Sequence, residues 1–213
     1  MNQHKLFQNK IRLNDEEEDD DEKPVVDKFA GSLWTKKQEE LFFKNRCIYL
    51  WGPVDDTSAK DICNRLLLLN ADNSSEEIKF FINSPGGVVT SGMVIYDTMQ
   101  MIEAPVSTIC MGLAASMGSV LLSGGVKGRR FIFPHGEVMI HQPSLGGYFQ
   151  GVSADLEIHA RQIQKTKEMS AKILADNCGQ PYEKVLKDLE RDYWMDAQDA
   201  IKYGIVDALI TKL

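Results

Sequence analysis

Short runs of apolar and β-branched residues alternate along the chain with segments whose apolar residues recur every three or four positions. The first pattern is typical of buried strands and the second of helices that bury one face. The predicted strands span 47–51, 78–82, 106–110, 129–134, 138–141 and 205–210. The predicted helices lie at about 33–45, 58–69, 89–99, 117–121, 154–177, 182–189 and 196–204. This alternation predicts an α/β fold with parallel strands joined by right-handed crossovers.

The segment VSTICMGLAASMGSVLLSGG, residues 106–125, stands out within this pattern. Its predicted strand runs into very small residues, and a helical spacing begins after Ser116. A sharp strand-to-helix turn can present one hydroxyl beside the free N–H groups of the first helical turn, which stabilise a developing oxyanion. The alternative is that small residues only let the helix pack closely on the strand. This segment alone does not decide between the two.

Composition places the chain among ordinary globular proteins. It has 213 residues, of which 43% are hydrophobic and 26% charged. No apolar run approaches the ~20 residues that span a membrane, and the N-terminus lacks the apolar core of a signal peptide. Four scattered cysteines show no metal-binding spacing. We interpret them as reduced structural residues, which predicts a cytoplasmic location.

Residues 1–30 are predicted to form an acidic, disordered arm that precedes a single folded domain over residues 31–213. Positions 15–22 are eight consecutive acids, and without these charges the formal net charge of −7 becomes +1. Such a block repels itself and cannot build a core. A role in partner docking or processing is the alternative to a merely solvated arm. The near-neutral remainder offers no basic stripe for nucleic acid.

A nucleophilic serine needs a base, and four histidines are available. His4 lies in the arm, His135 follows a proline in a turn, and His159 lies within a long polar helix. His141 ends a predicted strand just before the chain breaks at a proline, where a side chain can face a cleft. A structural role for His141 remains the alternative. Spacing alone does not choose the acid that would orient such a base.

Seven segments in the same order resemble the ClpP family, the proteolytic subunits of ATP-dependent Clp serine proteases. They are INSPGG (82–87), YDTMQ (96–100), STICMGLAASMG (107–118), VMIHQP (138–143), GG (146–147), LEIHAR (156–161) and YGIVD (203–207). The resemblance covers about residues 45–210. It implies that Ser116 is the nucleophile, His141 the general base and Asp192 the acid that orients the base. Asp188 and Glu190 lie close enough in sequence to compete with Asp192.

The resemblance also implies an oxyanion hole made by the backbone N–H groups of Gly87 and Met117. Taken alone, the Pro-Gly-Gly sequence would indicate an ordinary tight turn. An extended substrate would pair as a strand with backbone on both sides of the site, which ignores side-chain identity and gives broad specificity. The implied substrate-binding residues are Gly86, Val88, Leu145 and Gly146. This chemistry requires no metal or cofactor.

Family membership would imply a crotonase-like ββα superhelix with a protruding strand–helix handle at about residues 142–177. Members of the family assemble as two stacked heptameric rings and degrade unfolded polypeptides delivered by an AAA+ unfoldase of the ClpX, ClpA or ClpC type, which itself uses the ATP. The acidic run and the sequence KPVVDKF depart from the apolar N-terminal segment usual in the family.

Three other functions deserve comparison with this prediction. A catalytically silent ring subunit would typically have lost one of the three residues Ser116, His141 and Asp192. An acyl-CoA enzyme of the same fold would need neither the serine nor the histidine. An α/β-hydrolase requires glycine where Ala114 stands and a different order of the triad residues along the chain.

Overall fold

The structure, a computed structural model, describes residues 25–144 and 152–212. The chain divides between Glu39 and Glu40 into two units. Helix α1 (Val25–Lys44) spans this boundary and begins well before Leu33, where the apolar spacing predicts its start. None of the helices within the described ranges is both long and apolar enough to cross a membrane.

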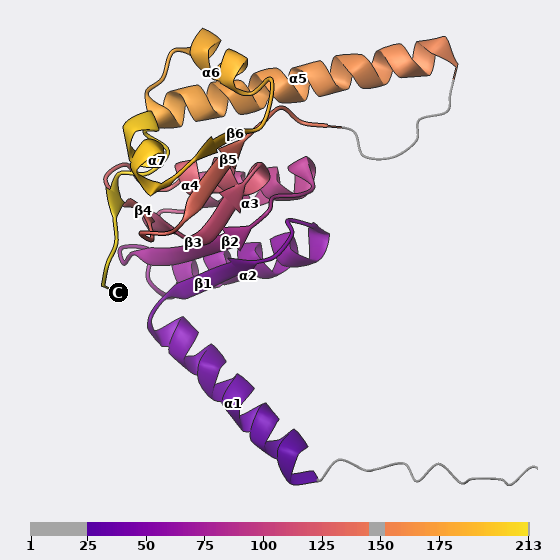
Figure 1. The fold of residues 1–213 in the computed structure, drawn as a ribbon. Coiled ribbons are helices and arrows are strands. Elements are labelled where there is room, and N and C mark those ends of the chain that lie inside the picture. Colours follow the sequence, from indigo (N-terminus) through magenta and orange to yellow (C-terminus); the bar gives the residue numbers. More distant parts are fainter. Residues whose placement is uncertain (1–24, 145–151, 213) are drawn as a thin grey trace, which may run out of the picture. The chain divides into compact units, whose positions relative to one another are not determined.

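The second unit is built on one mixed sheet of seven strands (Figure 1). The strands are β1 (Cys47–Trp51), β2 (Ile78–Ser84), β3 (Val106–Ala115), β4 (Arg130–Ile132), β5 (Glu137–Ile140), β6 (Tyr193–Met195) and β7 (Ala208–Leu209). Their order is β1-β2-β3-β4-β7, and β5 pairs with both β3 and β6. All pairings are parallel except that of β5 with β6. The predicted α/β architecture is therefore confirmed, whereas the finer crotonase-like superhelix stays a prediction.

The sheet forks along β3, its longest strand. The first half of β3 pairs with β4, with Thr108 opposite Arg130. The second half pairs with β5, with Ala115 opposite Met139. One strand thus holds two different neighbours on the same edge, and the branch that carries β5 leads to the end of β3 where Ser116 follows.

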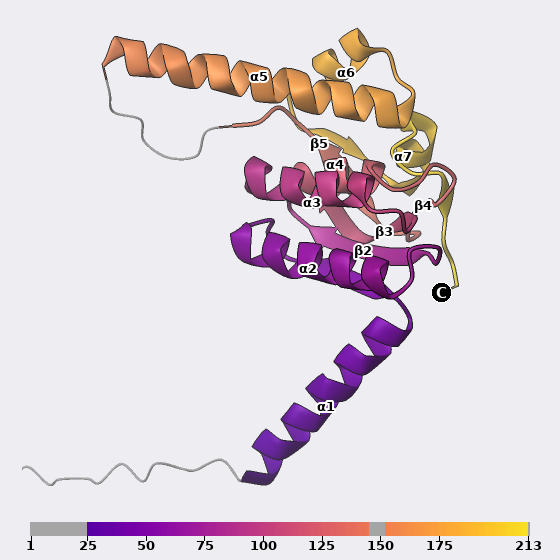
Figure 2. The same cartoon turned by 180° about the vertical axis from the view of Figure 1, so that it is seen from behind.

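In the part of the chain that the structure describes, six helices follow β1 in the second unit. They are α2 (Asp56–Asp72), α3 (Val89–Met101), α4 (Met117–Ser123), α5 (Ser153–Cys178), α6 (Tyr182–Asp188) and α7 (Ala197–Tyr203). Figure 2 shows α2 and α3 side by side over one face of the sheet, and α2 packs on both α3 and β1. The core between helices and sheet includes Ile48, Leu50, Leu66, Phe80, Ile95 and Leu121, none more than 1% exposed.

Local chemistry explains where the helices begin and end. Helix α7 is capped by the Asp196 carboxylate, which accepts the N–H of Asp199, and ends at a left-handed Gly204, as the sequence predicts. The predicted start of α2 at Ser58 is wrong, because the helix begins at Asp56. The Asp55 carboxylate accepts the Ser58 N–H, and the Ser58 hydroxyl accepts the Asp55 N–H in return. The acid-first form of this reciprocal cap places the N-cap three residues earlier.

The strands differ from the predictions in length. Strand β3 continues to Ala115, beyond the β-branched run that ends at Cys110, because its small residues still pair with β2 and β5. The last strand shrinks from the predicted 205–210 to Ala208–Leu209. Strand β6 has no predicted counterpart, since three residues are too few for a period to appear.

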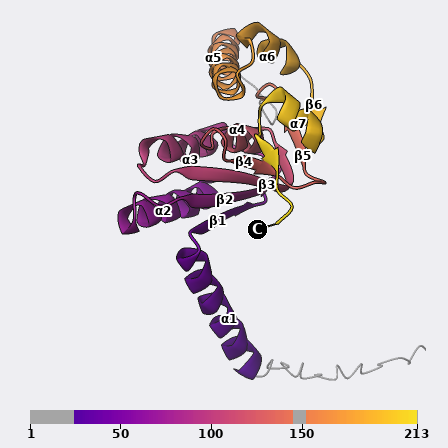
Figure 3. The same cartoon turned by 90° about the vertical axis from the view of Figure 1, so that its left-hand side faces the viewer.

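Helix α5 is buried at one end only. Ala171, Leu174 and Ala175 in its C-terminal half are at most 6% exposed, whereas Leu156 and Ile158 near its start are 47% and 60% exposed. Figure 1 shows the N-terminal half extending past the sheet, and Figure 3, a view close to the axis of α5, shows α6 beside it. The polar helix predicted over 154–177 is therefore present, and its apolar residues near the start lack cover within this chain.

Candidate active site

Ser116 occupies the turn between β3 and α4. Its backbone has φ 53° and ψ −120°, a region that residues with a Cβ rarely adopt. The Ser116 N–H donates to the Met139 carbonyl at 2.8 Å, which ties the turn to the neighbouring strand β5. The half-buried side chain lies where the first N–H groups of α4 are unpaired within the helix. The sequence-predicted turn is thus present, with the hydroxyl at its apex.

His141 follows the last residue of β5 directly, and its ring lies against Ser116. The distance from His141 Nε2 to Ser116 Oγ is 2.9 Å. Parallel pairing of β5 with β3 makes this contact, because the two strands end side by side and both side chains emerge at the same edge. Of the other histidines, His135 lies in the exposed turn before β5, His159 lies on α5, and His4 lies outside the described residues.

Asp192 is the carboxylate that reaches His141. The distance from Asp192 Oδ1 to His141 Nδ1 is 3.0 Å. Asp192 immediately precedes β6, and the pairing of Tyr193 with Ile140 sets it beside the histidine. A carboxylate can only accept, so Nδ1 carries the proton, and Nε2 is then free to accept from the Ser116 hydroxyl. The three predicted residues therefore form one hydrogen-bonded chain, although Asp192 is 60% exposed.

The carboxylate of Asp188 is engaged elsewhere. Lys184 Nζ and the Tyr203 hydroxyl both donate to Asp188 Oδ2, at 2.8 and 3.0 Å. Burial, together with the hydrogen bond to Asp188, raises the pKa of Tyr203, so this phenol stays protonated and continues to donate. Of the two competing acids considered from sequence, Asp188 is thus held by a cation and a phenol rather than by His141.

Gln142 links the histidine strand to the Asp192 segment. Its backbone N–H donates to the Leu189 carbonyl at 2.6 Å, and its side-chain Nε2 donates to the Glu190 carbonyl at 3.0 Å. Both acceptors lie within three residues of Asp192. Sequence reasoning did not identify this residue, although its place directly after His141 in VMIHQP was visible.

The two predicted oxyanion donors lie around the same turn. Met117 is the first residue of α4, so its N–H lacks a partner within the helix. Gly87 forms a parallel bridge with Val54, in which Gly86 accepts from the Val54 N–H and Val88 donates to the Val54 carbonyl. In such a bridge the N–H of the middle residue points away from the partner strand. The Gly87 N–H is therefore left for another acceptor.

Gly86 brings this loop into contact with the serine turn. Its φ is +89°, and a Cβ added there would lie 2.7 Å from Ser116 Cβ and 2.8 Å from the Met117 nitrogen. A Cβ at Gly87 would lie 2.2 Å from the Val54 carbonyl oxygen. Only glycine fits at either position, which explains the Gly-Gly pair physically.

The predicted substrate-binding residues are only partly described. Gly86 is buried and Val88 is 51% exposed. The Gly86 carbonyl and the Val88 N–H, which face Val54, are already hydrogen-bonded to it. Leu145 and Gly146 lie outside the described residues. Substrate pairing at these four positions stays a prediction.

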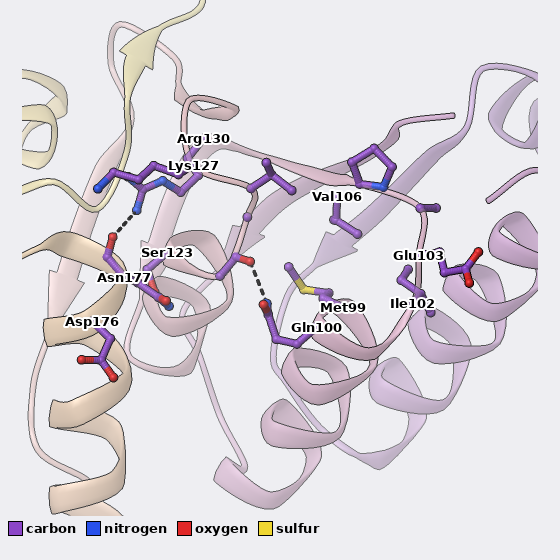
Figure 4. A pocket seen from close by; sticks show the side chains of 15 residues that line it. Met99, Gln100, Ile102, Glu103, Val106, Ser123, Lys127, Arg130, Asp176 and Asn177 are labelled. Atoms are coloured by element: carbon purple, nitrogen blue, oxygen red, sulfur yellow. Dashed lines mark hydrogen bonds between the residues drawn. The ribbon is translucent and has the colours of Figure 1, made fainter. Parts of the chain in front are cut away.

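A cavity of about 430 Å³ lies elsewhere, between the C-terminal ends of α3, α4 and α5 (Figure 4). Two of its polar lining residues are paired with backbone, since Gln100 donates to the Gly124 carbonyl and Arg130 donates to the Asn177 carbonyl, each at 2.8–2.9 Å. Within the described ranges, no three His, Cys, Asp or Glu side chains gather as metal ligands. The cysteines are free thiols, and burial raises the pKa of Cys110 to about 12.

Comparison with known families agrees with this geometry. The family model described as Clp protease matches residues 31–213. The chain belongs to the Clp protease family. The resemblance of its motifs to the family is thereby confirmed, and the chain is a proteolytic subunit of the Clp type. The match includes every residue of the Ser116–His141–Asp192 chain.

Proposed function

We propose that the protein is a serine endopeptidase that hydrolyses unfolded polypeptides to short peptides. The observation that carries this proposal is the continuous hydrogen-bonded chain from Ser116 Oγ through His141 to Asp192, with contacts of 2.9 and 3.0 Å. Membership of the Clp protease family supports the same reaction class.

In the first step, Ser116 Oγ attacks the scissile carbonyl while its proton moves to His141 Nε2. The resulting imidazolium is stabilised by Asp192, which accepts from Nδ1–H throughout. His141 then delivers the proton to the leaving amine, and an acyl ester on Ser116 remains. Water attacks this ester with His141 again as base, which releases the peptide acid and restores the hydroxyl.

The developing oxyanion would be held by the N–H groups of Gly87 and Met117. Each such donor is worth roughly 3–4 kcal/mol of transition-state stabilisation in other serine proteases. The positive end of α4 favours negative charge at the same place. The reaction needs no bound metal or cofactor for any of these steps.

We further propose that the chain assembles as two stacked heptameric rings and receives substrates from an AAA+ unfoldase of the ClpX, ClpA or ClpC type. The exposure of Leu156 and Ile158 near the start of α5 is consistent with a subunit contact along this helix. ATP would be consumed by the unfoldase. A cytoplasmic location would fit this partnership.

The test combines labelling with mass measurement. The full-length protein is treated with a fluorophosphonate probe, the modified residue is mapped by mass spectrometry, and the assembly is weighed by native mass spectrometry. Ser116→Ala and His141→Ala are compared with Ser123→Ala and His135→Ala, which remove the same residue types away from the hydrogen-bonded chain.

The proposal is supported if the probe labels Ser116 in the wild type and in both control variants, and if the labelled protein has the mass of a ring assembly. If His141→Ala loses the label and His135→Ala keeps it, His141 is identified as the base. An assembled ring without label, even after addition of an unfoldase, would instead indicate a catalytically silent subunit.

A further inference from the structure

Ser84 lies at the end of β2, just before the Pro-Gly-Gly loop. Its side chain is fully buried, with 0% exposure. Ser84 Oγ accepts the N–H of Gly86 at 3.1 Å. A serine hydroxyl that bonds the backbone two residues further on fixes a turn locally. This bond sets the direction in which the chain leaves β2 toward Gly87.

The other side of Ser84 faces the first turn of α4. A Cβ added at Gly118 would lie 3.2 Å from the Ser84 carbonyl oxygen and 3.5 Å from Ser84 Cβ. Gly118 directly follows Met117. Ser84 is therefore in close contact with both backbone segments that carry the proposed oxyanion donors, namely the loop through Gly86 and the start of α4.

We infer that Ser84 is a positioning residue for the oxyanion hole: its hydroxyl holds the Gly87 N–H at a fixed distance and angle from the Met117 N–H. Two donors act on one oxygen only if both point at it before the charge develops. Ser84 touches neither the substrate nor the reacting atoms. The inference rests on the proposed serine peptidase function, and it adds Ser84 to the residues that set the rate of peptide hydrolysis.

Bonds from Val54 fix the loop on its outer side, where Gly86 and Val88 are paired. Ser84 supplies the bond on the inner side. Without it, the Gly86 N–H is buried and unpaired, and the loop relieves this by turning toward another acceptor or water. A misplacement of about 1 Å at a catalytic group costs up to about 100-fold in rate. We therefore expect kcat of Ser84→Ala to fall roughly 10- to 100-fold, with KM nearly unchanged.

Ser123→Ala is the matched control. Ser123 is also buried, at 1% exposure, and its hydroxyl also accepts an N–H bond, from Asn177 Nδ2 at 3.0 Å. It lies at the opposite end of α4 from Met117. A general loss of packing or of a buried hydrogen bond affects both variants, whereas displacement of the oxyanion donors affects only Ser84→Ala.

The experiment measures kcat and KM for a fluorogenic peptide with the full-length wild type, Ser84→Ala, Ser84→Cys and Ser123→Ala. Final fluorophosphonate incorporation gives the fraction of working sites. A peptide boronic acid provides a second measurement, because its tetrahedral adduct on serine places an oxygen where the oxyanion forms. Its inhibition constant should rise by the same factor by which kcat/KM falls.

The inference predicts kcat per working site in the order wild type, Ser84→Cys, Ser84→Ala, because sulfur is a weaker acceptor than a hydroxyl oxygen. Ser123→Ala should match the wild type within about threefold. A kcat per working site in Ser84→Ala equal to that of the control would overturn the inference. So would a loss expressed in KM alone, or a boronate affinity that does not change.

An inactive, unlabelled wild type would contradict the proposed function itself. An active wild type with an unaffected Ser84→Ala contradicts only the role of Ser84. The two failures are therefore distinct in the same set of measurements.

Discussion

Arg46 and Ser116 are the two non-glycine residues of the described chain with a positive φ, at 54° and 53°. Both follow or precede a regular element, and both hold a strained backbone that costs about 1–3 kcal/mol. Their surroundings differ completely. The Arg46 side chain is buried against backbone carbonyls, whereas the half-buried Ser116 points its hydroxyl at an ionisable ring.

Strain at Arg46 is offset by hydrogen bonds within the fold. Its guanidinium donates to carbonyls of the last turn of α2 and of the following loop, and it also contacts Asp72 at 3.3 Å. The accepting carbonyls belong to Leu69, Asn73, Glu76 and Glu77, at 2.8–3.2 Å. Helix ends leave such carbonyls unpaired, and here one buried side chain satisfies several of them.

The strain at Ser116 is not offset by a comparable set of hydrogen bonds from its side chain. Within the described residues its side chain forms one hydrogen bond, with His141 Nε2, and that bond is suited to proton transfer rather than to holding the fold together. The comparison teaches that an unusual backbone angle does not by itself identify an active site. What distinguishes the two residues is whether the side chain completes the fold or remains available for chemistry.

Substitution of Ser116 should have the largest effect, and that effect should be on peptidase activity. Ser116→Ala and Ser116→Gly should both lower peptide cleavage by about 10⁴-fold or more. Glycine tolerates the turn geometry, so Ser116→Gly should also raise the free energy of unfolding by about 1 kcal/mol relative to Ser116→Ala. Peptidase assays and urea denaturation measure the two quantities. A glycine variant less stable than the alanine variant would show that the turn is not strained.

Arg46→Met should have the opposite effect. It removes the guanidinium donor from four carbonyls, so the free energy of unfolding should fall by about 3 kcal/mol, while kcat per folded site stays unchanged. Lys202→Met on α7 removes an exposed pair with Asp199 and should cost no more than about 0.5 kcal/mol. Urea denaturation of both variants tests the difference, and equal losses would contradict the capping role of Arg46.

Arg130 extends the comparison, because it is as buried as Arg46 but bonds mainly to one carboxylate rather than to backbone carbonyls. Its guanidinium bonds both oxygens of Asp207, at 2.6 and 2.9 Å. Burial opposes ionisation of Asp207, but the hydrogen bonds from Arg130 outweigh it and hold the pKa of Asp207 below its ordinary value of 3.8. The stabilisation is therefore present above that ordinary value and is lost as the pH falls through the lower folded-state pKa.

Asp207→Asn should accordingly lower the free energy of unfolding by about 2 kcal/mol at neutral pH. The difference from the wild type should shrink as the pH falls below 3.8, when Asp207 becomes protonated in the unfolded chain and then in the folded one. Urea denaturation at several pH values measures this. A difference that stays constant down to acid pH would mean that the carboxylate charge contributes nothing.

The smallest effect is expected at Gln142. Gln142→Ala removes the side-chain bond to Glu190 but keeps the backbone bond to Leu189, so Asp192 should be held less firmly and kcat should fall roughly two- to fivefold. Gln100→Ala removes a similar exposed bond, to the Gly124 carbonyl, far from the site and should leave kcat unchanged. Steady-state kinetics on the two variants decides whether the position of Gln142 matters.

Much of this site was predictable from sequence, for reasons that differ between residues. The turn at Ser116 is visible in the sequence because the strand, the small residues and the helix that form it are contiguous, whereas its role as nucleophile follows from the family resemblance. His141 could only be placed at a strand end, and the parallel pairing of β5 with β3 was needed to bring it to Ser116. Asp192 depends on the antiparallel strand β6, whose three residues show no period. Local pattern therefore finds the turn that presents the serine, while pairing between distant segments brings its partners to it.

Arg46 and Asp55 show the same limit in the fold. Nothing near Arg46 in sequence signals that its side chain will reach backbone more than twenty residues away. The predicted start of α2 at Ser58 fits one form of the capping box, a hydroxyl followed by an acid three residues on, whereas Asp55 and Ser58 form another. In both cases the outcome depends on which backbone groups come within hydrogen-bond distance in the folded chain, and residue spacing alone does not determine that.

The fork in β3 divides the sheet into branches of unequal strength. β2 and β3 share a long register and a common core, whereas the β5–β6 branch ends in a strand of three residues whose pairing carries Asp192. Amide hydrogens of β6 should therefore exchange with solvent through local opening well before those of β3. Each such opening separates the acid from its histidine while the rest of the sheet stays folded. Catalytic competence would then follow the opening equilibrium of one short pair of antiparallel strands rather than the unfolding of the whole chain.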